Sequence, residues 1–397
     1  MAVPYAILFV LQLIIITTTA VVFGWRIRSR RQRRQQQQSG SRPSYSDEKP
    51  LLLSRQAYAS PTIEPLPNFD WENEEPLKLR PFKPIYHITM ALQTATPSSL
   101  IILDKNYLSR VTARRKIISS YPSTVLGSIP SGLAPLREAY SYLLGTYLPA
   151  RYPSSSSSSP LFTTSQTPLF PCPYGLGGTG YFNNAITSRS FPLDPVESSL
   201  SPDEILKVLG ETVEDDIFLL IKDPARDEHV AVAFVCCHPS GFDPAEKLGK
   251  GLAAIHGPVP SYEKIGASME RFFSKLEVGK RVKRVNWSIQ THSDLYSPSG
   301  NHVHAEEEAR ELKEHEIKVE ECRFRVELQS LMRFPQTGAL MFSFKTFLYQ
   351  LEDIKREGLG GELADAIEGL GKGNAGGMRV YKGAVKWGAV LAAWLRA

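Results

Sequence analysis

An alternation of apolar and polar residues in the second half of the chain limits most strongly what this sequence can fold into. Residues 284–289 read RVNWSI, so the apolar side chains fall on one face of an extended chain and the Arg, Asn and Ser side chains fall on the other. Residues 322–330 alternate in the same way, and strand-like runs also cover 216–221, 230–237 and 339–349. The pattern predicts several strands, and the 284–289 strand presents a polar face suited to the wall of a pocket.

Helical periodicity marks four other segments. Residues 97–121 are predicted to form an amphipathic helix with Ser98 or Ser99 as its N-cap. Further helices are expected over 136–147 and 202–212, and a last one ends the chain over about 378–395.

One histidine stands at a corner that the sequence makes rigid. His256 is followed by Gly-Pro-Val-Pro at 257–260. Because proline has a fixed φ and lacks a backbone N–H, this run ends any helix or strand and stiffens the chain beyond the histidine. The corner aims the imidazole, although a hydrogen-bonded core histidine is the alternative. A helix-like segment that contains Phe272 follows.

The N-terminal segment predicts a membrane anchor. Residues 1–25 are almost wholly apolar, and about 20 apolar residues span a bilayer as a helix. Arginines follow directly, which places the body of the protein in the cytosol by the positive-inside rule and lets the basic run contact anionic lipid. Residues 26–66, basic and then rich in Gln, Ser and Pro, are predicted to be a disordered linker, and residues 67–397 the globular domain.

The charge balance bears on possible partners. The formal net charge is +5, but six arginines lie between Arg26 and Arg34, so the remainder is close to neutral. Nucleic-acid binding is therefore not expected. The four cysteines form no CxxC pair and are interpreted as buried, reduced thiols.

Several phrases, in order along the chain, carry a resemblance to a known family. They are RPFKPIYHITMAL (80–92), LDKNYL (103–108), LGTYLPARYP (144–153), PSGFDPAEKLG (239–249), IHGPVP (255–260), RFF (271–273) and RVNWSI (284–289). Together they resemble the heme-dependent oxidative N-demethylase family, also called HRQ-like. The resemblance runs from about residue 68 to the C-terminus and is interrupted by low-complexity or polar insertions near 153–180 and 292–321. It implies a PAS-like α+β fold, an antiparallel sheet with flanking helices, that holds a b-type heme.

The resemblance also implies a set of cofactor-binding residues. A heme needs an axial donor, an apolar slot and cations near its propionates. His256 is the candidate iron ligand, with His87 and then His238 as alternatives. The slot walls and the propionate partner are expected to be Phe272, Trp287 and Arg284. A second possibility for metal binding, His302 with His304, is disfavoured because nothing restricts the ligands of this polar, acidic segment to one geometry.

The implied activity is the oxygen-dependent removal of a methyl group from a small N-methylated amine. Such an amine is cationic at neutral pH, so Glu327 is expected to accept it, with Asn286 as a neutral helper. The chain has no convincing flavin or iron–sulfur pattern, so the electrons would come from a separate reductase.

Two other classes of function are considered. The family's E-R-Q-T-L phrase reads ELQSL at 327–331, so Leu328 stands where an arginine is expected, and Arg325 or Arg333 is a possible substitute. Loss of that arginine slightly favours a non-catalytic heme sensor or interaction module of PAS-like fold. A lumen-facing membrane enzyme, such as a glycosyltransferase, is the other alternative; the charge flank and the lack of a well-placed D-x-D motif oppose it.

Overall fold

The structure is a computed structural model that describes residues 62–153, 160–165, 180–303 and 310–397. Contacts divide the chain into one unit of residues 1–57 and a second unit, Tyr58–Ala397, to which all the described residues belong. The expected anchor and most of the expected linker lie outside the described residues. Within the described ranges, no helix combines the length and the apolar character that a membrane crossing needs.

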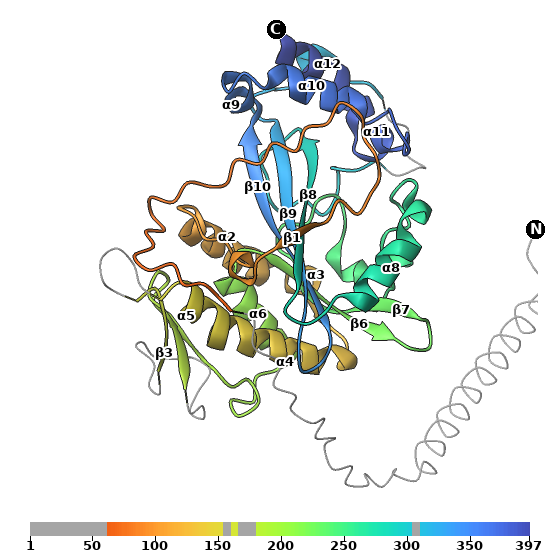
Figure 1. The fold of residues 1–397 in the computed structure, drawn as a ribbon. Coiled ribbons are helices and arrows are strands. Elements are labelled where there is room, and N and C mark those ends of the chain that lie inside the picture. The colour runs from red at the N-terminus through yellow and green to blue at the C-terminus, as the bar shows by residue number, and fades with distance from the viewer. Residues whose placement is uncertain (1–61, 154–159, 166–179, 304–309) are drawn as a thin grey trace, which may run out of the picture. The chain divides into compact units, whose positions relative to one another are not determined.

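A seven-stranded antiparallel sheet forms the centre of the second unit (Figure 1). Its strands, in spatial order, are β1 (Gln93–Ala95), β8 (Arg281–Gln290), β9 (Arg323–Arg333), β10 (Leu340–Gln350), β6 (Asp216–Asp223), β7 (Glu228–Val235) and β2 (Leu126–Ser128). A smaller sheet consists of β3 (Phe162–Ser165), β4 (Tyr181–Asn184) and β5 (Arg189–Pro192). With the helices that flank them, these antiparallel sheets confirm the expected α+β class and the strands that alternation predicted.

The helices follow the predicted periodicity with two exceptions, of which one is a break at Lys382 and Gly383 in the helix expected over 378–395. They are α2 (Tyr107–Ser120), α3 (Pro122–Val125), α4 (Leu133–Tyr142), the π-helix η3 (Leu143–Tyr147), α5 (Leu148–Arg151), α6 (Pro202–Thr212), α7 (Leu252–Ile255), α8 (Gly266–Lys275), α9 (Leu351–Arg356), α10 (Gly360–Gly369), α11 (Met378–Tyr381) and α12 (Ala384–Arg396). The helix expected from Pro97 is wrong in its first ten residues: 97–99 form one 3-10 turn, and α2 begins at Tyr107 without a side-chain cap. By contrast, α6 begins at Pro202 as predicted, and a capping box formed by Ser201 and Glu204 precedes it.

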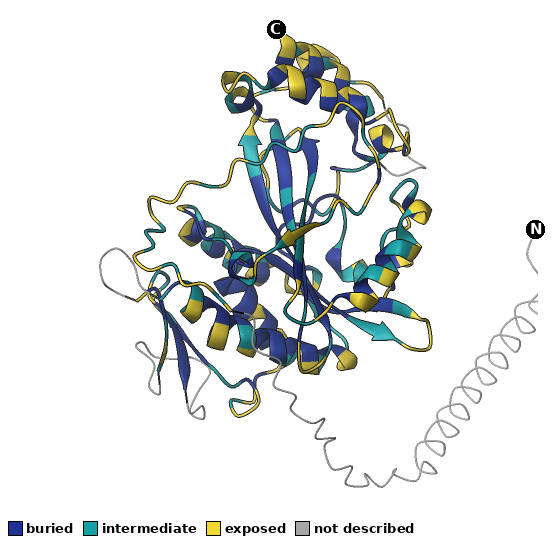
Figure 2. Cartoon of the chain, viewed as in Figure 1, coloured by how far each residue is buried: buried dark blue, intermediate teal, exposed yellow. Residues whose placement is uncertain are grey.

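The two faces of the large sheet have different surroundings, and successive side chains of each strand point to opposite faces. We call one the core face; it carries Trp287, Val326 and Phe347 in register across β8, β9 and β10. Helices α2, α4 and α6 cover one end of this face and α10 and α12 the other, and the strands between them are largely buried (Figure 2). We call the opposite side the cavity face; Asn286 and Glu327 are paired on it.

A buried ion pair joins the helical layer to the sheet. Arg114 of α2 donates to Asp216, the first residue of β6, over 2.6 Å, and neither side chain is exposed by more than 1%. The guanidinium also donates to the backbone carbonyls of Gly210, Glu214 and Asp215. These hydrogen bonds satisfy the buried charges, which are costly to leave unpaired.

We predict that Asp216→Asn lowers the free energy of unfolding by about 3 kcal/mol, because it leaves the buried Arg114 without its counter-charge. Urea denaturation followed by circular dichroism measures the change. Asp353→Asn is the matched control, since its ion pair with Arg356 lies at the surface and should contribute little. A loss for Asp216→Asn no larger than for the control would contradict this account.

Candidate functional site

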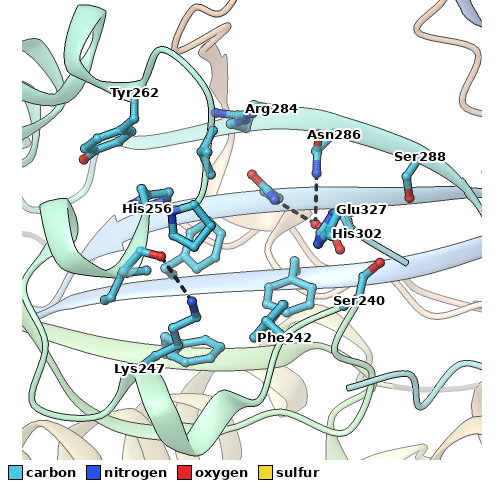
Figure 3. A pocket seen from close by; sticks show the side chains of 18 of the residues that line it. Ser240, Phe242, Lys247, His256, Tyr262, Arg284, Asn286, Ser288, His302 and Glu327 are labelled. Carbon is cyan, nitrogen blue, oxygen red and sulfur yellow. Dashed lines mark hydrogen bonds between the residues drawn. The ribbon is translucent and has the colours of Figure 1, made fainter. Parts of the chain in front are cut away.

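A cavity of about 580 Å³ opens on the cavity face of the sheet. Its floor is formed by β8, β9, β10 and β6, and its roof by the segment from Ser240 to Phe273, which includes α7 and most of α8 (Figure 3). Residues 86–92, which precede β1, and residues 378–386, which include α11, close one side. Apolar rings and aliphatic chains form much of its wall: Leu220, Leu252, Val259, Ile265, Met269, Phe218, Phe273, Leu331, Phe342 and Phe344. This combination of volume and apolar wall is that of a site for a small molecule or cofactor.

His256 projects into this cavity from the end of α7, and two contacts hold its ring. Nδ1 lies 2.8 Å from the carbonyl oxygen of Leu252, so the neutral ring carries its proton on Nδ1 and donates it there. The ring of Tyr262 stacks on the imidazole, with centroids 4.7 Å apart and planes 6° apart. Burial lowers the pKa of His256 to about 4. At neutral pH the Nε2 lone pair is therefore free to ligate a metal.

The Gly-Pro-Val-Pro run after His256 acts as the sequence predicted. Helix α7 ends at Ile255, and the backbone N–H of Val259 donates to the carbonyl of His256 over 2.8 Å. Ser261 then adopts a left-handed conformation with φ of 63°, which turns the chain so that Tyr262 reaches the imidazole. The corner thus fixes both the position and the direction of the ring.

Glu327 lies on the polar part of the floor, between two amide side chains. Gln329 donates its Nε2 proton to Glu327 Oε2 over 2.9 Å, and Asn286 Nδ2 lies at the limit of hydrogen bonding, 3.5 Å from the same oxygen. The nearest cation is Arg325, whose Nε is 4.0 Å from Oε1. Both donors serve one oxygen, so Oε1 keeps capacity for a further donor from the cavity.

A buried lysine that sequence reasoning missed supports this group. Lys382 Nζ donates to Asn286 Oδ1 over 3.1 Å and also to the carbonyl of Trp287. Burial lowers the pKa of Lys382 to about 8, although nearby Glu327 acts in the opposite direction. Lys382 thus orients the Asn286 amide so that its NH₂ group faces Glu327. No local sequence pattern marks this lysine, which the fold brings to β8 from the end of α11.

Basic side chains outnumber acidic ones around the cavity. Among them, Arg284 is a partly buried cation without an ion-pair partner in the described part of the chain. Its Nε is buried without a hydrogen-bond partner, and none of the described residues forms an ion pair with its guanidinium. Burial lowers the pKa of Arg284, and Tyr86 and Glu327 oppose that shift. Such a guanidinium is suited to bind a carboxylate that enters the cavity.

The structure does not bring every predicted residue to this cavity. His87 is exposed and does not line it, and Phe272 packs against the apolar cluster under α8 while its neighbour Phe273 lines the wall. Trp287 borders the cavity, but its ring packs on Phe324 in the core, with centroids 5.5 Å apart. His238 is fully buried outside the lining, where desolvation and neighbouring arginines lower its pKa well below the usual range.

Leu328, which stands where the family phrase has an arginine, does not face the cavity. Leu328 lies on the core face in the cluster with α10 and α12, because its neighbours Glu327 and Gln329 occupy the cavity face. The two substitutes considered for the missing arginine also separate. Arg325 lines the cavity, whereas Arg333 donates to the backbone carbonyls of Leu276, Phe273 and Gly338.

His302 and Tyr381 are further lining residues on the Glu327 side. Their rings stack with centroids 4.3 Å apart, and His302 is among the lining side chains labelled in Figure 3. Sequence reasoning paired His302 with His304, which lies outside the described residues. In the described part of the chain, no group of three or more His, Cys, Asp or Glu residues is placed to hold a metal ion.

A family model described as "Haem-dependent oxidative N-demethylase, alpha subunit-like" matches residues 91–392, which is well over half of the chain. The chain belongs to this family. The family name indicates heme dependence and an oxidative demethylase-like function that uses a substrate and oxygen. The resemblance drawn from the sequence phrases is thereby confirmed.

The residues of the cavity fit a heme. His256 would hold the iron of a heme through its neutral Nε2 lone pair, because the macrocycle itself would supply most of the other ligands. The apolar wall suits the macrocycle, and the unpaired Arg284 guanidinium is suited to a propionate.

Proposed function

We propose that this protein binds heme b in the cavity through His256 and removes a methyl group oxidatively from a small N-methylated amine. The observation that carries the proposal is the state of His256: it is neutral, hydrogen-bonded through Nδ1 and stacked on Tyr262 in the lining of the cavity, so Nε2 is the nitrogen left to ligate a metal. Phe273, Phe342 and Phe344 would flank the macrocycle, and Arg284 would pair with a propionate. The family membership supports the same choice of cofactor.

The overall reaction is that of a monooxygenase. The heme, when bound, supplies the site at which dioxygen is reduced. The amine, dioxygen, two electrons and two protons give the demethylated amine, formaldehyde and water. The carbon–nitrogen bond to the methyl group breaks, and one oxygen atom ends in formaldehyde while the other ends in water.

The chain's own residues would bind and orient the amine. Glu327 Oε1 would accept an N–H of the cationic amine, since the amides of Gln329 and Asn286 occupy the other oxygen. Lys382 keeps the Asn286 amide in place through Oδ1. The aromatic walls exclude water and leave room for methyl groups. Glu327 and Asn286 would thus select a small cation and fix the direction of its methyl carbon.

The proposal includes a separate electron donor, a PAS-like fold and a membrane anchor. The absence of a flavin or iron–sulfur pattern in the sequence favours a separate reductase as the electron donor. The antiparallel sheet with a cavity roofed by short helices supports the PAS-like description. The apolar residues 1–25 and the arginines that follow favour a single-pass anchor with the domain in the cytosol.

We expect the full-length protein, expressed with heme supply, to show a Soret band that shifts or disappears in His256→Ala. The change removes the Nε2 donor while the cavity wall remains. His87→Ala is the matched control, since that histidine is exposed and outside the cavity, and its spectrum should equal that of the wild type. A band unchanged in His256→Ala would move the ligand elsewhere, and the lack of any band in the folded protein would refute the heme proposal.

Glu327→Gln should keep the Soret band and lower the rate of formaldehyde release by at least about tenfold, because the variant loses the charge that receives the amine. Formaldehyde formed from a panel of small methylamines, with a chemical reductant and oxygen, is the measurement. The control is Glu277→Gln, an exposed carboxylate that does not line the cavity. Equal rates in Glu327→Gln and the wild type would contradict the role of Glu327. A wild-type protein that accepts electrons but releases no formaldehyde would favour the sensor function.

Protease protection tests the proposed location. In sealed membrane vesicles whose outer surface is cytosolic, added protease should degrade the domain without detergent while a lumenal marker stays intact. Degradation only after detergent is added would place the domain in a lumen and favour the lumen-facing alternative. Recovery of the protein in the supernatant would contradict the anchor.

A further inference from the structure

A second cavity, of about 530 Å³, lies beside α4 and shares no described lining residue with the first. Its walls come from α4, from the residues that lead into β8, and from the turn between β9 and β10. One side is apolar: Leu100, Tyr142, Val278, Met332 and Phe334. The π-helix η3, which follows α4 directly, contributes Thr146. Single π-helical turns of this kind are frequent at functional sites.

The two acidic residues in the described lining of this cavity accept hydrogen bonds from neighbouring segments of the chain. Glu138 of α4 accepts hydrogen bonds from the backbone N–H groups of Gln336 and Thr337, over 2.7 and 2.8 Å, and from the Thr337 hydroxyl over 2.6 Å. Asp194 accepts from the backbone N–H groups of the two residues after Pro195. These bonds hold the turn and the loop in place: both oxygens of Glu138 are occupied, whereas Asp194 accepts from the described residues through Oδ1 alone.

Arg281 is a buried cation of this cavity that forms no direct ion pair with the described residues, although the nearby buried carboxylate of Asp215 opposes the lowering of its pKa by burial. Arg281 is 4% exposed, and its terminal nitrogens donate to the Thr96 carbonyl and the hydroxyls of Ser99 and Ser330 over 2.6 to 3.0 Å. Its Nε is buried without a partner, and it forms no ion pair with any described carboxylate. Burial lowers the pKa of Arg281 to about 10. An anion near this guanidinium would offset the cost of the buried charge.

Two further donors belong to the same cavity. Arg137, on α4, forms no hydrogen bond or ion pair with the described residues, and its Nε is buried. The hydroxyl of Tyr142 has no hydrogen-bond partner in the described ranges, and its ring packs edge-on against Phe334 with centroids 5.9 Å apart. Arg333 also lines the cavity, but backbone carbonyls take up its guanidinium.

We propose that this second cavity binds a small organic oxyanion, a carboxylate or a phosphate monoester with an apolar body, through Arg137, Arg281 and the Tyr142 hydroxyl. A guanidinium fork matches the oxygens of either group. The apolar wall and the volume favour an organic molecule over a bare inorganic ion. The inference is independent of heme binding, because it rests on residues of the second cavity alone.

Isothermal titration of the full-length protein with benzoate and with phenyl phosphate tests the site, and inorganic phosphate serves as a comparison. We expect one or both aromatic anions to bind more tightly than inorganic phosphate. Arg137→Gln should weaken that binding by about tenfold or more, because it removes an unpaired guanidinium. Arg226→Gln is the matched control, since this exposed arginine lies in the turn between β6 and β7, away from both cavities.

A folding control and a second variant accompany this titration. Circular dichroism establishes that each variant is folded, and Tyr142→Phe, which should also weaken binding, replaces Arg137→Gln if that variant does not fold. Binding that Arg137→Gln leaves unchanged would overturn the proposal. Binding that is lost in Arg284→Gln and kept in Arg137→Gln would also overturn it, because it would place the anion in the first cavity. Absence of binding by both aromatic anions at millimolar concentration would do the same.

Discussion

The buried pair of Arg114 and Asp216 is the constraint on which the floor of the first cavity depends. Asp216 receives not only the guanidinium but also the backbone N–H groups of Cys237 and His238, over 2.7 and 2.8 Å. The carbonyl of His238 in turn accepts from Arg325 over 2.5 Å, and Arg325 lies beside Glu327. Charge-assisted hydrogen bonds therefore connect a helix in the core to Arg325, whose Nε lies 4.0 Å from the Glu327 carboxylate without a hydrogen bond to it. Geometry at the site is fixed from behind the sheet.

The sequence predicted the strands well because alternation is a local property. The RVNWSI segment became β8 with Arg284, Asn286 and Ser288 toward the cavity, and the rigid corner after His256 formed as expected. The helix expected from Pro97 was wrong in its first ten residues, because only a 3-10 turn precedes α2 at Tyr107. Periodicity shows which residues share a face, but it does not show what covers that face.

For the same reason, the candidate site was only partly predictable. His87 sits in a strand-like phrase, yet it is exposed, and Lys382 enters the site only through the docking of α11 beside β8. In α8 the two adjacent phenylalanines Phe272 and Phe273 pack in the same apolar cluster, but only Phe273 lines the cavity. Such outcomes are set by contacts between distant segments, which no local pattern contains.

The alternation of β9 has a consequence for how this protein tolerates insertions and deletions. Along 11 residues the strand passes its side chains in turn to the core and to the cavity. Loss of one residue at the start of β9 would shift the register and move every later side chain to the other face. Glu327 would enter the apolar core, and Leu328 would face the cavity. A change of side chain in this strand affects one compartment, whereas a change of length disrupts both at once.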